Sequence, residues 1–474
     1  MTTLSTPVST PASTPAALPN VIVFLTDQQR WDTTGSHGNP LGLTPNFDRL
    51  AAGGTLLENT FTVQPVCGPS RACMQTSQYA TQIGVFKNGI PLPQDVPTMA
   101  RAFRDNGYQT GYIGKWHLAS EEPVPASERA GYDYWLDANL LEFSSDAYDT
   151  VVYDANGEPQ KLPGYRVDAL TDAAIRFVND HTNKQQDAPF FLFVSLLEPH
   201  HQNHVDDYIA PHGYQAPYQG SWLPPDLAAL PSLYNSVQRH VAGYYGMVKR
   251  IDEAFGRLID ALHSLNLMQD TITVFTSDHG CHFRTRNDEY KRSCHEASLR
   301  VPTLFTGHNF TGGGRISELV TLLDLAPSVL DACGLDIPES FEGQSIVPLL
   351  AGGNVTNSRG RDHVFFQISE SEVGRGVRTK RWKYAVTAPE HNGFEDAYAD
   401  TYHEAYLYDL EHDPYELHNL VAYASHEEVR AWLRGLLEAD IAEIEGVTCT
   451  VVPAETQGKV FFDNRVAVFS KDET

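Results

Sequence analysis

Several residues that could do chemistry stand just after apolar segments of the chain. They are Asp27 after Asn20–Thr26, Lys115 after Gln109–Gly114, His200 after Phe190–Leu197, and Asp278 with His279 after Thr271–Ser277. Short segments rich in Val, Ile, Phe and Leu are typical of strands buried on both faces of a parallel sheet. The carboxyl ends of such strands share one sheet edge, where ligands bind. We therefore expect carboxylates, a lysine and histidines to meet there, a set suited to a cation and an anion.

The segment Val66–Cys73 places a cysteine near the start of a predicted helix. Pro69 suits the first turn of a helix, so we expect Cys67 just ahead of the helix N-terminus. Free amides and the helix dipole at that point favour an anion and lower the pKa of a thiol, and Arg71 adds a fixed positive charge. Taken alone, the segment fits a capped helix with a buried cysteine equally well.

Residues 67–71, Cys-Gly-Pro-Ser-Arg, are similar to the Cys-x-Pro-Ser-Arg signature of the type I, formylglycine-dependent sulfatases of the alkaline phosphatase-like superfamily. The resemblance covers about residues 20–420 and runs through Asp27, Gly114–His117, Pro199–His200, Ser277–Gly280, Arg300–Pro302, Arg378–Lys383 and Leu407–Asp413. It implies that a formylglycine-generating enzyme converts Cys67 to 3-oxoalanine, an aldehyde that hydrates to a diol. One hydroxyl can attack sulfur, and the second can then expel sulfate, which a serine could not do.

The resemblance also implies one bound divalent cation, with these expected ligands: Asp27, Gln28, modified Cys67, Asp278 and His279. Many sulfatases have Asp and Asn at the positions of Gln28 and His279, so the pattern here resembles the choline sulfatase and phosphonate monoester hydrolase branch. Oxygen ligands favour calcium, while a histidine ligand makes manganese an alternative, and magnesium is another. A loop-packing amide is the other interpretation of Gln28.

The resemblance implies roles for six further residues. Arg71 orients the diol, Lys115 and Lys291 bind sulfate and stabilise charge in the transition state, and His117 triggers sulfate elimination. His200 protonates the leaving alcohol, with His201 as the alternative donor. Asn88 contacts sulfate or shapes a turn. His117 stands two residues after Lys115, so an extended segment would point both side chains to the same side.

The implied activity is that of an arylsulfatase-like sulfuric ester hydrolase. It would convert aryl, alkyl or sugar sulfate monoesters to the alcohol and inorganic sulfate. The pair Lys115 and His117 favours sulfate over phosphonate, but a phosphonate monoester or phosphodiester hydrolase on the same scaffold remains an alternative. A second alternative is a non-catalytic anion-binding protein in which Cys67 stays a thiol.

The pattern of elements predicts an α/β protein with an alkaline phosphatase-like fold. Helical segments at Val167–Asn179 and Arg239–Leu265 alternate with the strands above and with Pro302–Thr306, which predicts a large, mostly parallel mixed sheet between helices. After Gly352–Gly360 we expect a smaller antiparallel subdomain, with strands His363–Ser369, Arg375–Thr379, Lys383–Val386 and Ala405–Asp409 and a helix His426–Glu445. The predicted division is a flexible tail at 1–19, a catalytic domain at 20–355 and an α+β subdomain with its tail at 356–474.

Composition excludes several classes of protein. The 474 residues carry a formal charge of −26, which argues against binding to nucleic acid or to an anionic membrane. The longest apolar run, Phe190–Leu197, is too short to span a bilayer, and no secretory signal is recognised, so a cytoplasmic enzyme is expected. Six scattered cysteines do not suggest a disulfide framework. The branch that the chain resembles often assembles through C-terminal extensions, so the resemblance implies a homo-oligomer interface at the apolar residues after Gly446, Val451–Val452 and Val460–Phe462.

Overall fold

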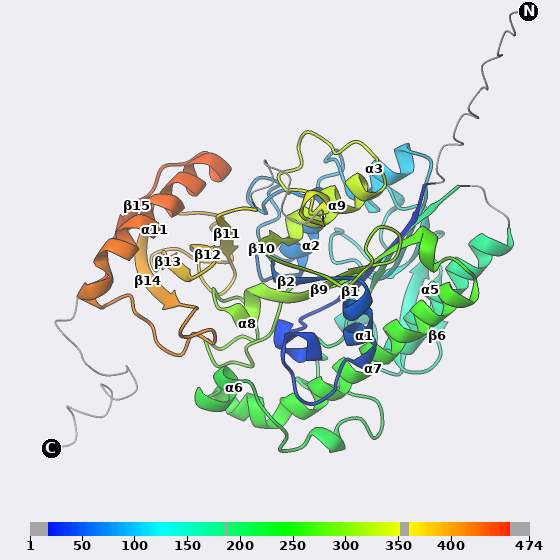
Figure 1. Cartoon of the computed structure of the whole chain (residues 1–474), viewed down its shortest axis with the longest axis horizontal. Coiled ribbons are helices and arrows are strands. Elements are labelled where there is room, and N and C mark those ends of the chain that lie inside the picture. Colours follow the sequence, from blue (N-terminus) through cyan, green and yellow to red (C-terminus); the bar gives the residue numbers. More distant parts are fainter. Residues whose placement is uncertain (1–17, 185–187, 351–359, 456–474) are drawn as a thin grey trace, which may run out of the picture.

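The structure is a computed structural model that describes residues 18–184, 188–350 and 360–455. It contains two sheets with their helices, seen in Figure 1 as a large body and a smaller one rich in C-terminal elements. The predicted flexible tail, apart from its last two residues, and the predicted boundary at residue 355 lie outside the described residues.

The larger sheet has ten strands in the order β10-β2-β9-β8-β1-β7-β3-β4-β5-β6. Neighbours among β8, β1, β7, β3 and β4 run parallel, which confirms the predicted mostly parallel, mixed sheet. The strands are β1 Asn20–Thr26, β2 Thr55–Phe61, β3 Gln109–Lys115, β4 Tyr134–Ala138, β5 Thr150–Asp154, β6 Pro159–Leu162, β7 Phe190–Ser195, β8 Thr271–Ser277, β9 Arg300–Thr306 and β10 Gly314–Thr321.

One predicted parallel strand is wrong in direction. Strand β9, which contains Pro302–Thr306, runs antiparallel to both β8 and β2. A parallel neighbour needs a crossover that returns the chain to the opposite sheet edge. Residues 278–299 contain one short helix, α8 (Glu296–Leu299), and the chain enters β9 from the edge at which β8 ended.

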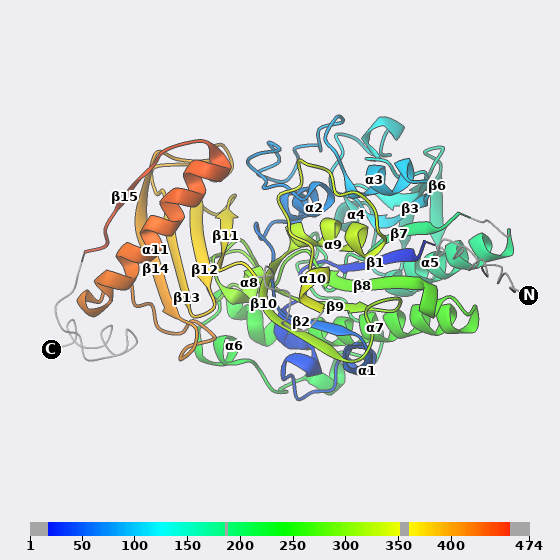
Figure 2. The same ribbon diagram turned by 45° about the horizontal axis from the view of Figure 1, so that its top comes forward.

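Helices cover both faces of the large sheet (Figures 1 and 2). Helices α1 (Pro45–Gly53), α5 (Arg166–Asn183) and α7 (Ser236–Ser264) lie on one face, and α2 (Cys67–Thr76), α3 (Met99–Asp105) and α9 (Leu325–Ala332) lie on the other. Strand β1 serves both cores because its side chains alternate: Phe24 packs on the α5 and α7 side, and Val23 on the side of α2 and α3. The shorter helices are α4 Leu141–Ser144, α6 Pro225–Ala229 and α10 Val347–Leu350.

The smaller sheet confirms the predicted C-terminal antiparallel unit. Its order is β11-β12-β13-β14-β15, antiparallel from β11 to β14. Its strands are β11 His363–Ile368, β12 Gly374–Thr379, β13 Trp382–Thr387, β14 Thr401–Asp409 and β15 Thr450–Val452, and Figure 2 shows helix α11 (Glu427–Asp440) lying across them. Leu433 and Leu437 of α11 belong to the core of this unit.

Strand β15 changes the interpretation of the C-terminal apolar residues. It pairs in parallel with β14, and Val451 is buried in the core of the small unit. This side chain is therefore satisfied within the chain and is not free to form a subunit interface. Val460–Phe462 lie outside the described residues, and the homo-oligomer stays a prediction.

A buried charge cluster joins the two units. The Lys383 ammonium of β13 lies 2.8 Å from a carboxylate oxygen of Glu296 and 2.7 Å from one of Glu416. All three side chains are buried, so removing one partner would leave an uncompensated charge inside the protein. The position of the small unit against the β8–β9 connection is thus fixed by charge as well as by packing.

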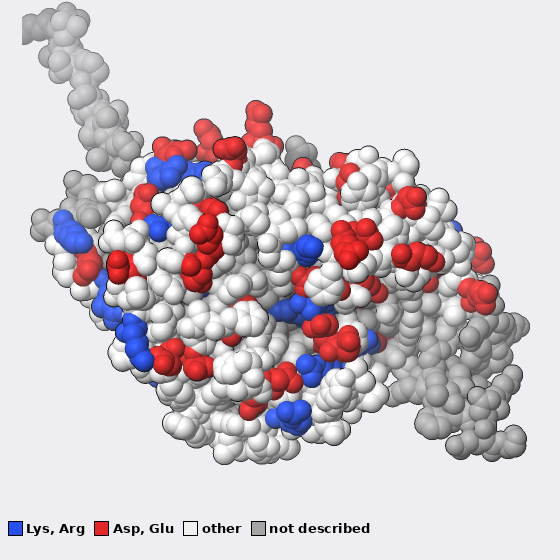
Figure 3. All heavy atoms as spheres, turned by 180° about the vertical axis from the view of Figure 1, so that it is seen from behind, with Lys and Arg blue, Asp and Glu red and all other residues white. Residues whose placement is uncertain are grey.

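The surface reflects the acidic composition. On the face drawn in Figure 3, Asp and Glu side chains lie singly or in small groups with Lys and Arg among them. In the described part of the chain, no helix combines the length and apolar character needed to cross a bilayer.

Candidate active site

Four neighbouring strands bring the predicted residues to one edge of the large sheet. Strands β8, β1, β7 and β3 are adjacent and parallel, so their carboxyl ends coincide. Asp27 follows β1, Asp278 follows β8, and Lys115 is the last residue of β3. His200 comes five residues after β7 ends. Helix α2 adds Cys67 from the chain that follows β2.

Cys67 lies at the centre of this group. It is the first residue of α2, one position inside the predicted place, and is 2% exposed. Its sulfur lies 2.8 Å from Lys291 Nζ, 3.2 Å from His279 Nε2 and 3.6 Å from Asp27 Oδ1. Burial raises the pKa of the thiol, but the charges of Lys115 and Lys291 outweigh burial and hold the pKa well below its usual value.

Arg71 forms ion pairs with both carboxylates of the site. Its Nη2 lies 3.1 Å from Asp27 Oδ2, and its Nε lies 3.2 Å from Asp278 Oδ2. Nη1 donates to the Lys115 carbonyl at 2.8 Å and to Ser195 Oγ at 2.7 Å. The guanidinium is thus held by partners from four strand ends, and it fixes both carboxylates beside Cys67.

The donor atoms around Cys67 fit one cation. Ligand atoms of Asp27, Cys67, Asp278 and His279 lie within 4.8 Å of one another, and all four residues are buried. His279 Nδ1 lies 3.0 Å from the Gly280 carbonyl and must donate to it, which leaves Nε2 as a ligand atom. Burial and the charge of Asp27 raise the pKa of Asp278, and a divalent cation would offset this repulsion.

Gln28 packs its loop, which is one of its two predicted interpretations, and its role as a metal ligand stays a prediction. Its backbone N–H donates to Asp278 Oδ1 at 3.1 Å, and its side-chain nitrogen donates to the Tyr208 hydroxyl at 2.9 Å. The amide therefore packs the loop. Its side-chain oxygen is buried and has no hydrogen-bond partner among the described residues, so it remains available as a further oxygen ligand.

Lys115 and His117 face the same site, though not for the predicted reason. The chain is not extended beyond β3, because His117 has a left-handed backbone with φ of 63°. Lys115 Nζ lies between Asp27 Oδ2 at 2.8 Å and Glu142 Oε1 at 2.9 Å. His117 Nδ1 is 3.7 Å from the same Glu142 oxygen. A backbone turn, and not strand alternation, therefore brings the imidazole back beside the lysine.

Sequence reasoning missed Glu142. This residue lies on α4, just after β4, and β4 was not among the predicted strands. Because β4 is the parallel neighbour of β3, its carboxyl end reaches the same sheet edge. Recognising that strand would have placed Glu142 among the candidates. Burial raises the pKa of its carboxyl, but Lys115, His117 and His200 outweigh burial and lower it.

Two stacked histidines follow β7. The rings of His200 and His201 lie 4.3 Å apart at 15°. His200 Nδ1 donates to the His201 carbonyl at 2.6 Å, which leaves its Nε2 for other partners. Burial, followed by the charges of His200 and Lys291, holds the pKa of His201 well below its usual value, so that ring is neutral.

Lys291 and Asn88 reach the site from loops. His282 Nε2 donates to the Lys291 carbonyl at 2.9 Å and fixes the backbone from which the lysine extends. Asn88 Oδ1 accepts the N–H of Gly68 at 2.8 Å in the first turn of α2. Asn88 thus has a structural role at a helix start, and the residue also borders the cavity described next.

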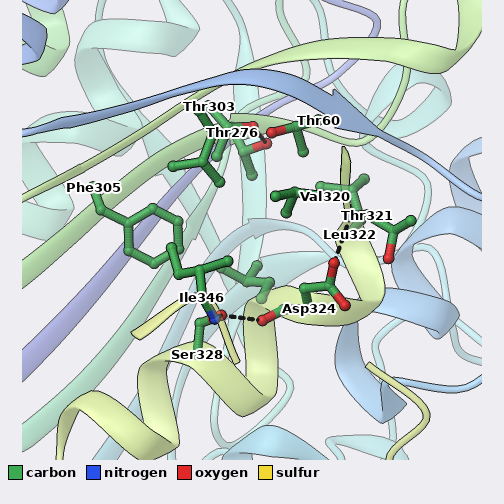
Figure 4. Close-up of a pocket in the computed structure, with 12 residues that line it drawn as sticks. Thr60, Thr276, Thr303, Phe305, Val320, Thr321, Leu322, Asp324, Ser328 and Ile346 are labelled. Carbon is green, nitrogen blue, oxygen red and sulfur yellow. Dashed lines mark hydrogen bonds between the residues drawn. The ribbon is translucent and has the colours of Figure 1, made fainter. Parts of the chain in front are cut away.

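A cavity of about 420 Å³ opens from Cys67 to the surface. Its wall combines the chemical residues with an outer rim: Cys67, Asn88, Gly89, His117, Leu140, Glu142, Phe143, His200, His201, Asn203, Glu289, Tyr290, Lys291, Arg292, Glu370 and Phe394. The hollow in Figure 4, lined among others by Thr303 and Phe305, has about 10 Å³ open to water, room for about one molecule. Of these two, only the larger cavity can admit a substrate.

Comparisons with known proteins agree with this geometry. The sequence matches the family described as Sulfatase over residues 19–335, and the family described as N-sulphoglucosamine sulphohydrolase, C-terminal, over residues 288–443. It is 31% identical over 449 residues to an ulvan-active sulfatase of Formosa agariphila, covering 90% of this chain and 81% of that protein. It is 25% identical over 500 residues to an N-acetylglucosamine-6-O-sulfatase of Bacteroides thetaiotaomicron, covering 89% and 86%.

A solved phosphonate monoester hydrolase of Agrobacterium radiobacter has the same fold. Its TM-score is 0.68 at 23% identity, over 90% of this chain and 96% of that one. At this identity the likeness concerns the fold alone, and the predicted kinship to that branch stays a prediction. The relatives in sequence are sulfatases, so the phosphonate and non-catalytic alternatives are not favoured. Because the sulfatase match covers more than half of the chain, this chain belongs to the sulfatase family and is a sulfuric ester hydrolase with an alkaline phosphatase-like fold.

Proposed function

We propose that this sulfatase hydrolyses sulfate monoesters of carbohydrates, with Cys67 converted to formylglycine and one divalent cation bound beside it. The observation that carries the proposal is the placement of Cys67. Ligand atoms of two carboxylates and of the His279 imidazole lie within 4.8 Å of its sulfur, and the ammonium of Lys291, which lines the cavity, lies 2.8 Å from it. The first set suits a cation and the second an anion, as attack on a sulfate ester requires.

The cation would be held by Asp27, Asp278, His279 and the oxygen of the modified residue 67, with Gln28 as a further oxygen donor. When bound, it lowers the pKa of a hydroxyl at residue 67 and so generates the nucleophile. The mainly oxygen donors favour calcium, while His279 keeps manganese as an alternative to it, along with magnesium. Arg71 fixes both carboxylates and keeps this arrangement in place.

The modified residue would supply a geminal diol, made after synthesis by a formylglycine-generating enzyme acting on the Cys67 segment. Lys115 and Lys291 bind the sulfate group and stabilise the charge that develops in the transition state. Asn88 adds a neutral donor at the same place. Fixed cations are effective here because they lie in a buried setting, where charges interact more strongly than in water.

Two histidines divide the proton transfers. His117 removes the proton from the second hydroxyl of residue 67, which releases sulfate and restores the aldehyde. His200 protonates the departing alcohol through Nε2. His201 is the weaker candidate, because its neutral ring has no additional proton to give.

A carbohydrate leaving group is supported by the outer part of the cavity and by the relatives. Phe143 and Phe394 border the rim and are 66% and 49% exposed, so they offer flat apolar faces to a sugar ring. Arg292, Glu289 and Asn203 supply polar groups for hydroxyls. The names of the relatives refer to ulvan and to N-acetylglucosamine.

Peptide mass spectrometry and a substrate panel test the proposal. The protein is produced together with a formylglycine-generating enzyme, purified and digested. The mass of the peptide that contains residue 67 is then measured. We expect the mass of the aldehyde, and release of sulfate from monosaccharide sulfates faster than hydrolysis of an aryl phosphonate. Cys67→Ala is the control for contaminating activity. A thiol at residue 67 in fully active protein, or a preference for the phosphonate, would contradict the proposal.

A further inference from the structure

Glu142 is a buried carboxylate at the catalytic cavity that the roles above leave unused. It is 3% exposed and borders the cavity together with Cys67, His117 and His200. Its Oε1 lies 2.9 Å from Lys115 Nζ and 3.7 Å from His117 Nδ1. One oxygen therefore faces both the lysine proposed to bind sulfate and the histidine proposed to take a proton.

The lysine gains a defined direction from this contact. An ammonium has three N–H donors, and that of Lys115 donates one to Asp27 Oδ2 at 2.8 Å and forms an ion pair with Glu142 Oε1 at 2.9 Å. A donor of the ammonium remains for a sulfate oxygen. With a single carboxylate partner the ammonium could rotate, so the second carboxylate limits the directions in which that donor can point.

The histidine gains a defined tautomer. Its Nδ1 is buried and has no hydrogen-bond partner among the described residues, and its side chain borders the cavity together with Cys67. A carboxylate facing Nδ1 favours the proton on that nitrogen, so the other nitrogen is free to accept one. A contact of 3.7 Å is longer than a hydrogen bond, and such contacts often tighten when substrate binds.

We propose that Glu142 is a positioning residue for sulfate release, orienting Lys115 toward sulfate and His117 toward the second hydroxyl of residue 67. The inference rests on the proposed function. In the step concerned, the hydroxyl proton passes to His117 and the O–H electron pair forms the C=O bond. The bond between that carbon and the sulfate oxygen breaks, and its electron pair leaves with sulfate. The negative charge of Glu142 stabilises the imidazolium formed in this step.

Glu142→Gln isolates the charge. The amide keeps the size of the side chain and an oxygen that can accept from Lys115, but it no longer stabilises a charged His117. We expect the first release of alcohol to stay near the wild-type rate, while steady-state turnover falls by about 10- to 100-fold, the range for a group that orients a reacting residue. The peptide holding residue 67 should then gain the mass of one sulfo group during turnover. Glu142→Asp should restore part of the rate.

Glu122→Gln is the matched control. Glu122 Oε2 accepts the backbone N–H groups of Asn139 and Leu140, so it supports the segment that leads into Glu142, but it does not border the cavity. We expect this variant to keep wild-type kinetics and an unmodified peptide mass. Thermal unfolding of both variants reports any loss of fold.

Several outcomes would overturn the inference. Wild-type turnover by Glu142→Gln, an equal slowing of both phases without the added mass, or the same pattern in Glu122→Gln would each do so. Failure of the proposed function is a separate result, because it appears in the wild-type protein as a residue 67 that remains a thiol or as absent sulfate release.

Discussion

The two ends of the catalytic cavity are built differently. At the inner end, Cys67, Lys115 and Lys291 are buried and joined by contacts of 2.8 to 3.6 Å to carboxylates and to each other. At the outer end, Phe143 and Phe394 stand largely exposed with no comparable network. Fixed charges stabilise a transition state only when they are held in place, whereas a leaving group can be accommodated by looser contacts. We therefore propose that the inner end defines the reaction and that the outer end selects the substrate.

The ends also come from different parts of the fold. The inner end arises from adjacent strand ends of the large sheet, whose position is fixed by the sheet itself. The outer end combines α4, the β8–β9 connection and the small unit, which contributes Glu370 and Phe394. Arg292 bridges these parts, with guanidinium contacts of 2.8 Å to Glu289 and 2.5 Å to Glu370. The small unit therefore contributes to the wall of the cavity in which we propose that the leaving group binds.

The largest effect is expected from Cys67→Ser. A serine at residue 67 lacks the second hydroxyl that releases sulfate, so steady-state turnover should fall by more than about 10³-fold, in the range seen when a nucleophile is removed. The fold should persist, because the side chains are nearly the same size. Measured rates on an activated aryl sulfate and on a sugar sulfate should fall together, since the inner end serves both. Repeated turnover at the wild-type rate would disprove the formylglycine mechanism.

A comparable loss is expected from Asp278→Ala, through the cation. The substitution removes one of two carboxylates from the ligand cluster, and elemental analysis should find the bound metal lost together with nearly all activity. Asp137→Asn is a matched control, because Asp137 is also a buried carboxyl on β4 but lies outside the ligand cluster. Full metal occupancy in Asp278→Ala would show that the ligand assignment is wrong.

The contrast between the two ends also explains what the sequence could predict. The strand-end residues and the Cys67 segment could be predicted from the sequence, because local pattern and sheet topology together determine where they lie. Glu142 could not be predicted, because the strand that precedes it is short and its partners are distant in sequence. Arg292 was not a candidate either, because its contact with Glu370 comes from the small unit. Long-range contacts of this kind leave no periodic pattern in a single sequence.

A smaller and selective effect is expected at the boundary between the ends. If His200 is the acid, His200→Ala should slow the hydrolysis of sulfate esters with poor leaving groups by roughly 10²–10⁴-fold. Hydrolysis of activated phenyl sulfates should hardly change, because only poor leaving groups need a proton in the transition state. Rates across a series of substituted phenyl sulfates should depend more steeply on leaving-group pKa. His201→Ala is the control and should leave the slope unchanged. A steeper slope for His201→Ala alone would move the role to that residue.

The smallest effect is expected at the outer rim, and it tests whether the rim selects the substrate. Phe143→Ala and Phe394→Ala each remove an aromatic face worth about 0.5–1.5 kcal/mol against a stacked ring, which corresponds to a rise in KM of roughly 2- to 10-fold. The kcat should hardly change, because neither side chain reaches the inner charges. Trp432→Ala is the control, since Trp432 is equally exposed on α11 but does not border the cavity. An effect on kcat that is equal for sugar sulfates and a small alkyl sulfate would mean that the rim supports the inner end, and the division between chemistry and selection would fail.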